Sequence, residues 1–483
     1  MTKARDIADL LDATGDVVSS ALDNVPPSDN ASSLTTGTLP VARLADGSIA
    51  GTKISDGSIT GAKLGNDAKV VKSASAPSSP VEGDLWYDTG DETLKIYSNT
   101  DSAFVKVVRV IPTLGSISGN IINATAGNLT LNGTGFLASN LEVSFTPSGG
   151  SSSTVTVTPT NDTTATVAIP SAIYGQSNGT VITISVTNSD LKSSGGLNKT
   201  VIVLPSGGTK VSSGGYTYHT FTSSTTFENT ISNLAVDYLM VAGGGSGGSY
   251  GGGGGAGGLL NGSATLSAQN YSIVVGAGGT HSIGSPSHAG GQQTQGTDGN
   301  DTTAFSLTAI GGGGGGDGGS GNTGSAGGSG GGGAYAGGSG GAGTSGQGNA
   351  GGGSTYGNPY PSGGGGGAGS AGGDATSITQ AGYGGDGLQF STYATATSTG
   401  DSGYYAGGGG GGVASGGSYT SGGQSGTGGT GGGGDGGVGG SGQSAGQANT
   451  GGGGGSGAYN GSTDRYYPQN GGSGILILKY ADI

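Results

Sequence analysis

The chain has 483 residues and a formal net charge of −14, and 119 of its residues are glycine whereas only 9% are charged. Proteins contain on average roughly 7% glycine and 25% charged residues, so this composition argues against a single large apolar core and equally against charged disorder. The acidic balance disfavours nucleic acid as a partner, which requires a basic surface, and the lack of cysteine excludes disulfides and thiolate metal sites.

The first 35 residues are interpreted as an attachment segment. Ala4, Ile7 and Leu10 follow helical spacing, which predicts one short amphipathic helix. Two helical turns are only marginally stable alone, so this helix is expected to need a docking protein or other copies of the chain. The start lacks the apolar core of a signal peptide, and the sequence has no run of about 18 apolar residues. We therefore expect synthesis in a cytoplasm and no membrane insertion.

Residues 36–76 are predicted to form a repetitive shaft. The aliphatic residues that recur at every fifth position are Leu39, Leu44, Ile49, Ile54, Ile59 and Leu64. A period of five fits neither a helix nor a simple strand, but it suits short extended pieces broken by Asp-Gly turns. One chain cannot bury one residue in five, whereas three chains around a common axis can. The alternative is a flexible linker.

Residues 77–110 are predicted to be a small β module and residues 111–207 an immunoglobulin-like β-sandwich that serves as a spacer. In the module, Trp86 is interpreted as the anchor of a small core rather than as a ligand-stacking residue. In the sandwich, short alternating segments recur at intervals typical of immunoglobulin-like domains. The candidate strands are Leu129–Leu131, Leu141–Phe145, Thr154–Thr158, Ala165–Ile169, Val181–Val186 and Val201–Leu204.

Residues 208–483 are predicted to form a glycine-rich domain closed by β-strands. Strand signals occur at Tyr216–Phe221, Asp237–Val241 and Ile475–Tyr480, and we expect the last two to lie side by side. A flexible linker is the default for glycine-rich sequence, and the strict repeat of collagen is absent. The ordered alternative is a bundle of polyglycine II-like helices, with three residues per turn, held together by backbone hydrogen bonds. The predicted fold class is therefore mainly β.

No pattern indicates catalysis, a metal site or a cofactor. No Ser-His-Asp or Cys-His grouping has a structural context. His281 and His288 could share a divalent ion, although a solvated loop is the favoured interpretation. Paired carboxylates for glycoside hydrolysis stay open as an alternative, but the glycine-rich half has no glutamate after Glu228.

Tyrosines between the glycine runs are the candidate contact residues. A tyrosine ring offers a large contact area with a polar tip at low entropic cost; the alternative is that the rings only cover backbone between the runs. The candidates are Tyr356, Tyr360, Tyr393, Tyr404, Tyr405, Tyr419, Tyr459, Arg465, Tyr466 and Tyr467. Arg465 is one of few cations in this half and is a reasonable contact for an anionic sugar.

Several segments of the chain resemble tail-fibre proteins of tailed phages, especially those of marine cyanobacterial phages. They are Ala4-Arg-Asp-Ile-Ala-Asp-Leu-Leu11, Thr38-Leu-Pro-Val-Ala-Arg-Leu-Ala-Asp-Gly47, Glu82-Gly-Asp-Leu-Trp-Tyr-Asp88, Tyr238-Leu-Met-Val-Ala-Gly-Gly-Gly245 and Gly474-Ile-Leu-Ile-Leu-Lys-Tyr480. Residues 111–204, with Leu131-Asn-Gly-Thr-Gly-Phe136, are similar to immunoglobulin-like domains of the plexin and transcription-factor type.

The resemblance implies a virion location, a homotrimer and attachment to the host. Residues 1–35 would then dock on a phage tail or adaptor protein, and the glycine-rich loops, with the candidate tyrosines, would bind a host-surface glycan or outer-membrane protein. One alternative is a purely structural virion component, such as a collar, whisker or tail adaptor. Another is a depolymerase that acts on surface polysaccharide. The favoured expectation is a non-enzymatic tail fibre.

Overall fold

The computed structural model describes residues 70–483, except residues 91, 108–110, 137–140, 189–192, 282–293, 320–321, 336, 414–421, 440 and 459–466. The predicted helix in residues 1–35 and the five-residue repeats up to residue 69 lie outside the described residues. The described chain is mainly β, as predicted, with several small sheets. It divides into two compact units, residues 1–109 and 110–483.

The first unit contains one four-stranded sheet. Its strands, in spatial order, are β1 (Val70–Ser73), β2 (Leu85–Asp88), β3 (Thr93–Ser98) and β4 (Ala103–Lys106). β1 runs parallel to β2, and the other pairs are antiparallel. The sheet thus begins before residue 77, within the range predicted for the repeats.

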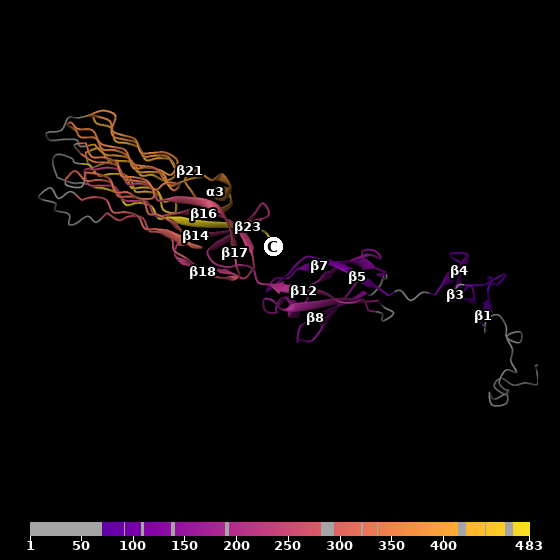
Figure 1. The fold of residues 1–483 in the computed structure, drawn as a ribbon. Coiled ribbons are helices and arrows are strands. Elements are labelled where there is room, and N and C mark those ends of the chain that lie inside the picture. The colour runs from indigo at the N-terminus through magenta and orange to yellow at the C-terminus, as the bar shows by residue number, and fades with distance from the viewer. Residues whose placement is uncertain are drawn as a thin grey trace, which may run out of the picture. The chain divides into compact units, whose positions relative to one another are not determined.

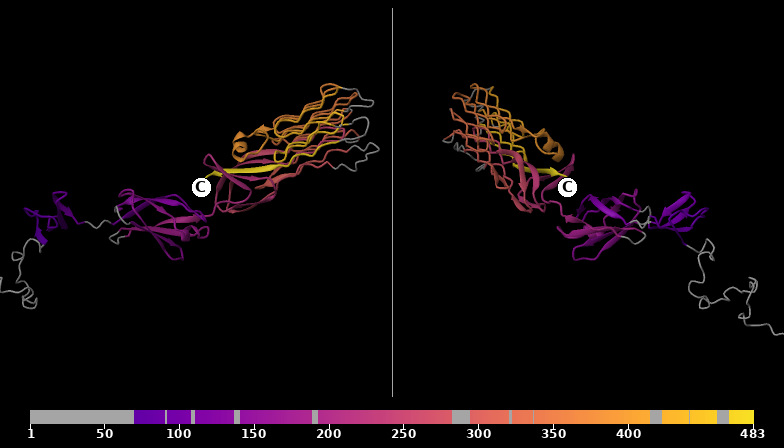
Figure 2. Two further views of the ribbon diagram at one scale, coloured as in Figure 1. Left: turned by 180° about the vertical axis from the view of Figure 1, so that it is seen from behind. Right: turned by 45° about the vertical axis from the view of Figure 1, so that its right-hand side comes forward.

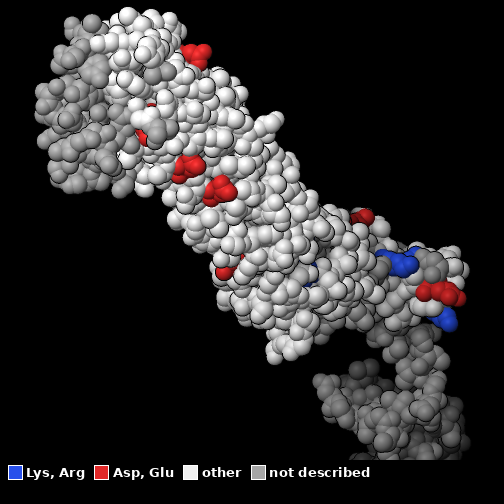
Figure 3. Space-filling model, turned by 60° about the vertical axis from the view of Figure 1, so that its left-hand side comes forward, with Lys and Arg blue, Asp and Glu red and all other residues white. Residues whose placement is uncertain are grey.

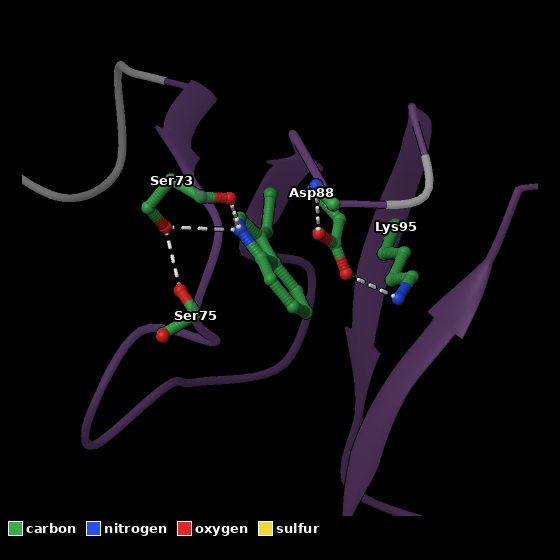
Figure 4. A network of polar contacts seen from close by, with 6 residues as sticks. Ser73, Ser75, Asp88 and Lys95 are labelled. Carbon is green, nitrogen blue, oxygen red and sulfur yellow. Dashed lines mark hydrogen bonds and ion pairs between the residues drawn. The ribbon is translucent and has the colours of Figure 1, made fainter.

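Trp86 holds one face of this sheet together (Figure 4). Its side chain is only 6% exposed, and its Nε1–H group donates to the carbonyl and the hydroxyl oxygens of Ser73 at 3.1 and 3.0 Å. Phe104 packs edge-on at 5.3 Å between ring centroids, and the ammonium of Lys95 lies 4.7 Å from the indole centroid. Lys95 also pairs with Asp88 at 2.7 Å. These contacts agree with the interpretation of Trp86 as a core anchor.

Residues 111–207 form two sheets that share one hydrophobic core. One sheet has the order β10-β7-β5, and the other has the order β6-β12-β11-β8-β9. The strands are β5 (Thr113–Ser118), β6 (Ile121–Ile122), β7 (Asn128–Thr134), β8 (Leu141–Pro147), β9 (Ser153–Val157), β10 (Thr164–Ala168), β11 (Val181–Thr187) and β12 (Leu197–Ile202), with one short helix, α2 (Ser171–Tyr174). All six predicted strands overlap observed ones, while β5 and β6 were not predicted.

The core between these sheets is made by alternate residues of the strands. Leu131, Phe145 and Ile184 are completely buried, whereas their neighbours along each strand are partly or fully exposed. This two-residue period is what a strand with one buried face requires, and it explains why these strands could be found from the sequence.

A five-stranded sheet, here called the base sheet, closes the glycine-rich region. Its order is β13 (Thr209–Ser213), β14 (Tyr216–Phe221), β23 (Ile475–Ala481), β16 (Leu234–Val241) and β17 (Leu259–Leu266). β16 and β23 pair antiparallel, with Asp237 opposite Lys479, and these two side chains form an ion pair of 3.1 Å. The predicted pairing of Asp237–Val241 with Ile475–Tyr480 is therefore confirmed.

Smaller elements surround the base sheet. β15 (Thr225–Asn229) pairs with β18 (Gln269–Ile273), β19 (Thr302–Ala304) with β20 (Leu307–Ala309), and β21 (Leu388–Gln389) with β22 (Tyr404–Tyr405), and α3 spans Ser391–Thr397. Between the strands, glycine runs extend side by side away from the base sheet (Figures 1 and 2).

Backbone hydrogen bonds join these runs with a period of three residues. In residues 252–258, each backbone N–H group donates to a carbonyl oxygen of one of three neighbouring runs. Gly252, Gly255 and Gly258 donate to Gly316, Gly313 and Ile310; Gly253 and Ala256 donate to Gly363 and Gly366; Gly254 and Gly257 donate to Gly454 and Gly451. Every third residue therefore donates to the same neighbouring run. Of these three neighbours, one runs parallel to residues 252–258 and two run antiparallel to them.

Adjacent runs meet at backbone contact, which leaves no room for side chains. A Cβ atom placed on Gly254 would lie 2.1 Å from the carbonyl oxygen of Gly245, and one placed on Gly365 would lie 1.9 Å from that of Gly254. Both separations are far below van der Waals contact. Hydrogen bonding therefore dominates the packing of the runs on one another, whereas the base sheet packs on two clusters of buried apolar side chains.

Candidate functional site

The glycine runs reverse direction at an end of the region that lies away from the base sheet, here called the far end (Figures 1 and 2). β16 continues into residues 243–249, the chain turns at Tyr250, and residues 252–258 return to β17. The N–H group of Gly248 donates to the carbonyl oxygen of Gly252 at 3.0 Å across this turn. Tyr250 thus lies at the point of the turn that is most remote from the base sheet.

Four tyrosine rings from three turns form a continuous row at the far end, here called the tyrosine row. The ring centroids of Tyr250 and Tyr335 are 5.4 Å apart, those of Tyr335 and Tyr360 are 4.4 Å apart, and those of Tyr360 and Tyr356 are 6.1 Å apart. These distances lie in or near the range of favourable aromatic pairs. Contact between rings therefore links turns that are distant in the sequence, as Tyr250 and Tyr335 are, with 85 residues between them in numbering.

The row grades from buried to exposed. Tyr250 is only 6% exposed, Tyr335 and Tyr360 are half-buried, and Tyr356 is 73% exposed. Ile378, which is 50% exposed, belongs to the adjacent turn, because a Cβ atom on Gly357 would lie 2.9 Å from its Cγ2 atom. The open end of the row thus offers an aromatic ring beside an aliphatic side chain.

Three tyrosines of the row have a left-handed backbone. Their φ angles are 53° at Tyr250, 31° at Tyr335 and 58° at Tyr360. This conformation costs a bulky residue on the order of 1–3 kcal/mol, whereas glycine adopts it freely. In a chain with 119 glycines, a tyrosine at these positions indicates that the ring supplies a packing or binding contact that glycine cannot.

Charge is sparse in the glycine-rich region. Figure 3 shows that the drawn flank carries only a few isolated acidic side chains. From residue 208 onward the sequence has three cations, Lys210, Arg465 and Lys479, and Lys479 is paired with Asp237 in the base sheet. The geometry therefore suits recognition by aromatic, aliphatic and backbone groups rather than by charge.

Three of the candidate tyrosines lie near the base sheet and not in the row. Tyr405 is completely buried, and its hydroxyl group lies 2.7 Å from the Oγ1 atom of Thr399. Tyr393 is half-buried in α3, against the ring of Tyr218 at 6.3 Å, and burial raises its pKa to about 12. Tyr404 pairs with Gln389 between β22 and β21. These rings stabilise the base end, and Tyr405 is removed from the contact candidates because no ligand can reach it.

The other candidates adjoin the far end or cannot be placed. Tyr419, Tyr459, Arg465 and Tyr466 lie outside the described residues. Tyr467 is half-buried, and it follows directly on that segment. A Cβ atom on Gly457 would lie 2.8 Å from the backbone nitrogen of Tyr467, and the N–H group of Gly457 donates to Gly248. Tyr467 therefore lies on the run that neighbours the Tyr250 turn.

Tyr250 and Tyr335 were missed by the sequence analysis. Each is a single tyrosine that interrupts two glycine runs, in Ser249-Tyr250-Gly251 and in Ala334-Tyr335-Ala336. A lone large residue between two glycine runs is the signal that identifies both.

The described residues offer little material for acid–base or metal chemistry. His219 is buried in the base sheet, where its Nδ1–H group donates to the carbonyl oxygen of Gly207 at 2.7 Å and Nε2 accepts from the hydroxyl group of Tyr480 at 2.9 Å. Burial lowers its pKa below the ordinary value of 6.5. Within the described part of the chain, no three His, Asp or Glu side chains gather as a group that could hold a metal ion.

Membrane insertion by a helix has no support in the described residues, since none of their helices is both long and apolar enough to span a bilayer. A family model for a glycine-rich domain matches residues 220–481. No curated protein matches the sequence.

Proposed function

The chain belongs to the glycine-rich domain family, and on this premise we propose that it is a non-enzymatic tail-fibre protein that attaches a phage virion to its host through the far end of the glycine-rich region. The observation that carries the proposal is the tyrosine row. Three strained tyrosines align behind the exposed ring of Tyr356, on turns that the glycine runs hold in place. The resemblance of the segments at both ends of the chain to phage tail fibres supports the virion location.

We assign the glycine runs to the polyglycine II conformation. Their hydrogen bonds repeat every three residues and reach three different neighbours, as expected for helices with three residues per turn and no internal hydrogen bonds. For residues 111–207 we propose an immunoglobulin-like sandwich, because two sheets, antiparallel except for the pair of β6 and β12, enclose one core. In this proposal the sandwich is a spacer and the glycine-rich region is the contact module.

The proposed partners follow from the same proposal. The host ligand is a surface glycan or an outer-membrane protein, since aromatic rings with polar tips bind both kinds of surface. Residues 1–35 dock on a phage tail or adaptor protein, and the chain assembles as a homotrimer. Nucleic acid is not a proposed partner because the chain is acidic.

Adsorption competition tests the host-contact proposal. The purified full chain is expected to block adsorption of the parent virus to its host in a dose-dependent way. Tyr356→Ala should raise the concentration needed for half-maximal blocking at least tenfold. Tyr216→Ala is the matched control, because Tyr216 is also exposed, at 41%, but belongs to the base sheet.

The outcome separates the three candidate functions. A folded chain that fails to block adsorption contradicts the proposal and favours a purely structural virion component, such as a collar, whisker or tail adaptor. Release of reducing sugars from host envelope would instead show a depolymerase.

A further inference from the structure

The four-stranded sheet of the first unit has an uncovered apolar face, here called the outer face. Paired residues on neighbouring strands lie on the same face of a sheet, so the register groups Val70 with Leu85, Leu85 with Ile96, and Ile96 with Val105. The same register groups Tyr87 with Leu94, and the N–H group of Val107 donates to the carbonyl oxygen of Leu94 at 2.9 Å. One apolar surface therefore runs across all four strands.

The apolar side chains of the outer face are between about a third and a half exposed in this chain. Their exposed fractions are 49% for Val70, 37% for Leu94, 36% for Ile96, 37% for Val105 and 52% for Val107. The opposite face, by contrast, is closed by Trp86, Phe104 and the Lys95–Asp88 pair. A contiguous exposed apolar patch is typical of a surface that another molecule covers.

A sheet of this size needs additional stabilisation. Domains below about 40 residues usually depend on disulfides, a bound metal or oligomerisation, and the described sheet spans only residues 70–107. The chain has no cysteine, and no group of metal-binding side chains occurs among the described residues. Oligomerisation is the means that remains.

We infer that the outer face is the contact between copies of this chain, packed against the same face of the other copies. Within strands β1–β4, all of which the structure describes, Lys72 is the one charged residue of this face, and it stands on the edge strand β1 with its ammonium 5.8 Å from the ring centroid of Tyr87. Copies that each carry a net charge of −14 repel one another. A face with a single charged residue, at its edge, allows copies of the chain to approach with little of this repulsion.

The sequence that leads into the sheet favours the same occupant. Residues 39–64 carry one aliphatic side chain every five residues, an arrangement that a single chain cannot bury, and Val70 follows shortly after. The repeats of residues 39–64 and the outer face, which follow one another in the chain, thus both need apolar partners. Other copies of the chain supply both at once, whereas an unrelated partner would have to match two different surfaces.

Analytical ultracentrifugation of the full chain tests this inference. The double variant Ile96→Lys with Val105→Lys is expected to weaken self-association at least tenfold, because it places charge in the centre of the contact. Thr100→Lys is the charge control, since Thr100 is exposed in the turn between β3 and β4. Fluorescence of Trp86, the chain's only tryptophan, reports whether the sheet stays folded.

Cross-linking gives a second readout that does not depend on a disruptive variant. Because the wild-type chain lacks cysteine, Ile96→Cys provides a single thiol, and a short bismaleimide should join copies into products of twice the chain mass. A monomeric wild-type chain, an unchanged mass of the lysine variant, or failure of Cys substitution to yield cross-linked copies would overturn the inference. Cross-linking to a different protein would assign the face to that partner instead.

This inference rests on the proposed homotrimer and locates its contact, and its test is separate from that of host attachment. A chain that self-associates through the outer face but does not block adsorption overturns host attachment and leaves this inference standing. A monomer that still blocks adsorption overturns this inference and the homotrimer, and leaves host attachment standing.

Discussion

The two parts of the second unit are stabilised in opposite ways. Residues 111–207 enclose a core of side chains such as Leu131, Phe145 and Ile184, and the backbone serves mainly to hold those side chains in place. In the glycine-rich region the neighbouring runs contact one another through the backbone itself. The sandwich is stabilised by burial of apolar area, and the glycine runs by many hydrogen bonds of about 1 kcal/mol each.

The difference teaches that glycine can specify a structure as strictly as a large side chain does. Glycine loses the most conformational entropy on folding, so a run of glycines is ordered only where each residue gains contacts. In residues 252–258 these contacts come from three sides. The structure is specific for glycine because the runs pack too closely for a Cβ atom, and an alanine or valine would clash with the neighbouring backbone.

The largest expected effect is in the sandwich. Phe145→Ala should lower the free energy of unfolding of residues 111–207 by about 3–5 kcal/mol, because it removes a completely buried ring. Differential scanning calorimetry of the full chain should show this transition moved to lower temperature and the transition of the glycine-rich region unchanged. Loss of both transitions together would show that the two parts unfold as one.

The glycine runs should respond to the opposite change. Gly254→Ala adds one methyl group at a position where Cβ would lie 2.1 Å from the carbonyl oxygen of Gly245, so we expect a loss of about 3 kcal/mol. Gly353→Ala is the control, because the nearest atom to its Cβ position is 3.5 Å away, and it should be neutral or slightly stabilising. Hydrogen exchange of the runs measures both; equal protection in the two variants would contradict backbone packing.

A smaller effect is expected from pH at the base sheet. Burial lowers the pKa of His219 below 6.5, so the unfolded chain binds more protons than the folded chain below that pH. Stability should therefore fall as the pH decreases from 7.5 to 5.5, by up to about 1 kcal/mol. His219→Gln should remove this pH dependence from the thermal unfolding temperature. The same slope in both proteins would assign the effect to other groups.

The smallest effect on stability should come from the open end of the tyrosine row. Tyr356→Ala removes a ring that is 73% exposed, so the free energy of unfolding should change by less than about 0.5 kcal/mol. Host adsorption, in contrast, should drop at least tenfold. A variant that loses stability and adsorption in parallel would show that this ring serves packing rather than contact.

The sequence revealed most of the strands but only part of the candidate site. Alternation of apolar and polar residues located β7 to β11, and two strongly apolar segments located β16 and β23, whereas the segment predicted at β12 meets only the last two residues of that strand. β5, which contains Gly115 and serines, and the two-residue β6 carry no such pattern. Their pairing depends on partners that are distant in the sequence.

The tyrosine row shows the same limit. Tyr356 and Tyr360 are predicted from their position between glycine runs, yet local sequence does not say which turns become neighbours. Tyr405 has the same local character as those residues, but its turn returns to the base end, where the ring is buried. Which turns lie next to one another depends on the order in which the glycine runs pack. The runs are too similar in sequence for this order to be predicted.

The three-residue period of hydrogen bonding also constrains how the runs can change in length. Removing three residues from a run such as 252–258 leaves every remaining N–H group facing its former neighbour, whereas removing one or two turns all later groups toward the wrong neighbour. A turn at the far end is not bound by this three-residue period, and doubling its length costs only about 0.6 kcal/mol of chain entropy. Insertions and deletions should therefore accumulate at the far end in any number but within the runs only in multiples of three, so that the tip can diversify while the lattice beneath it stays fixed.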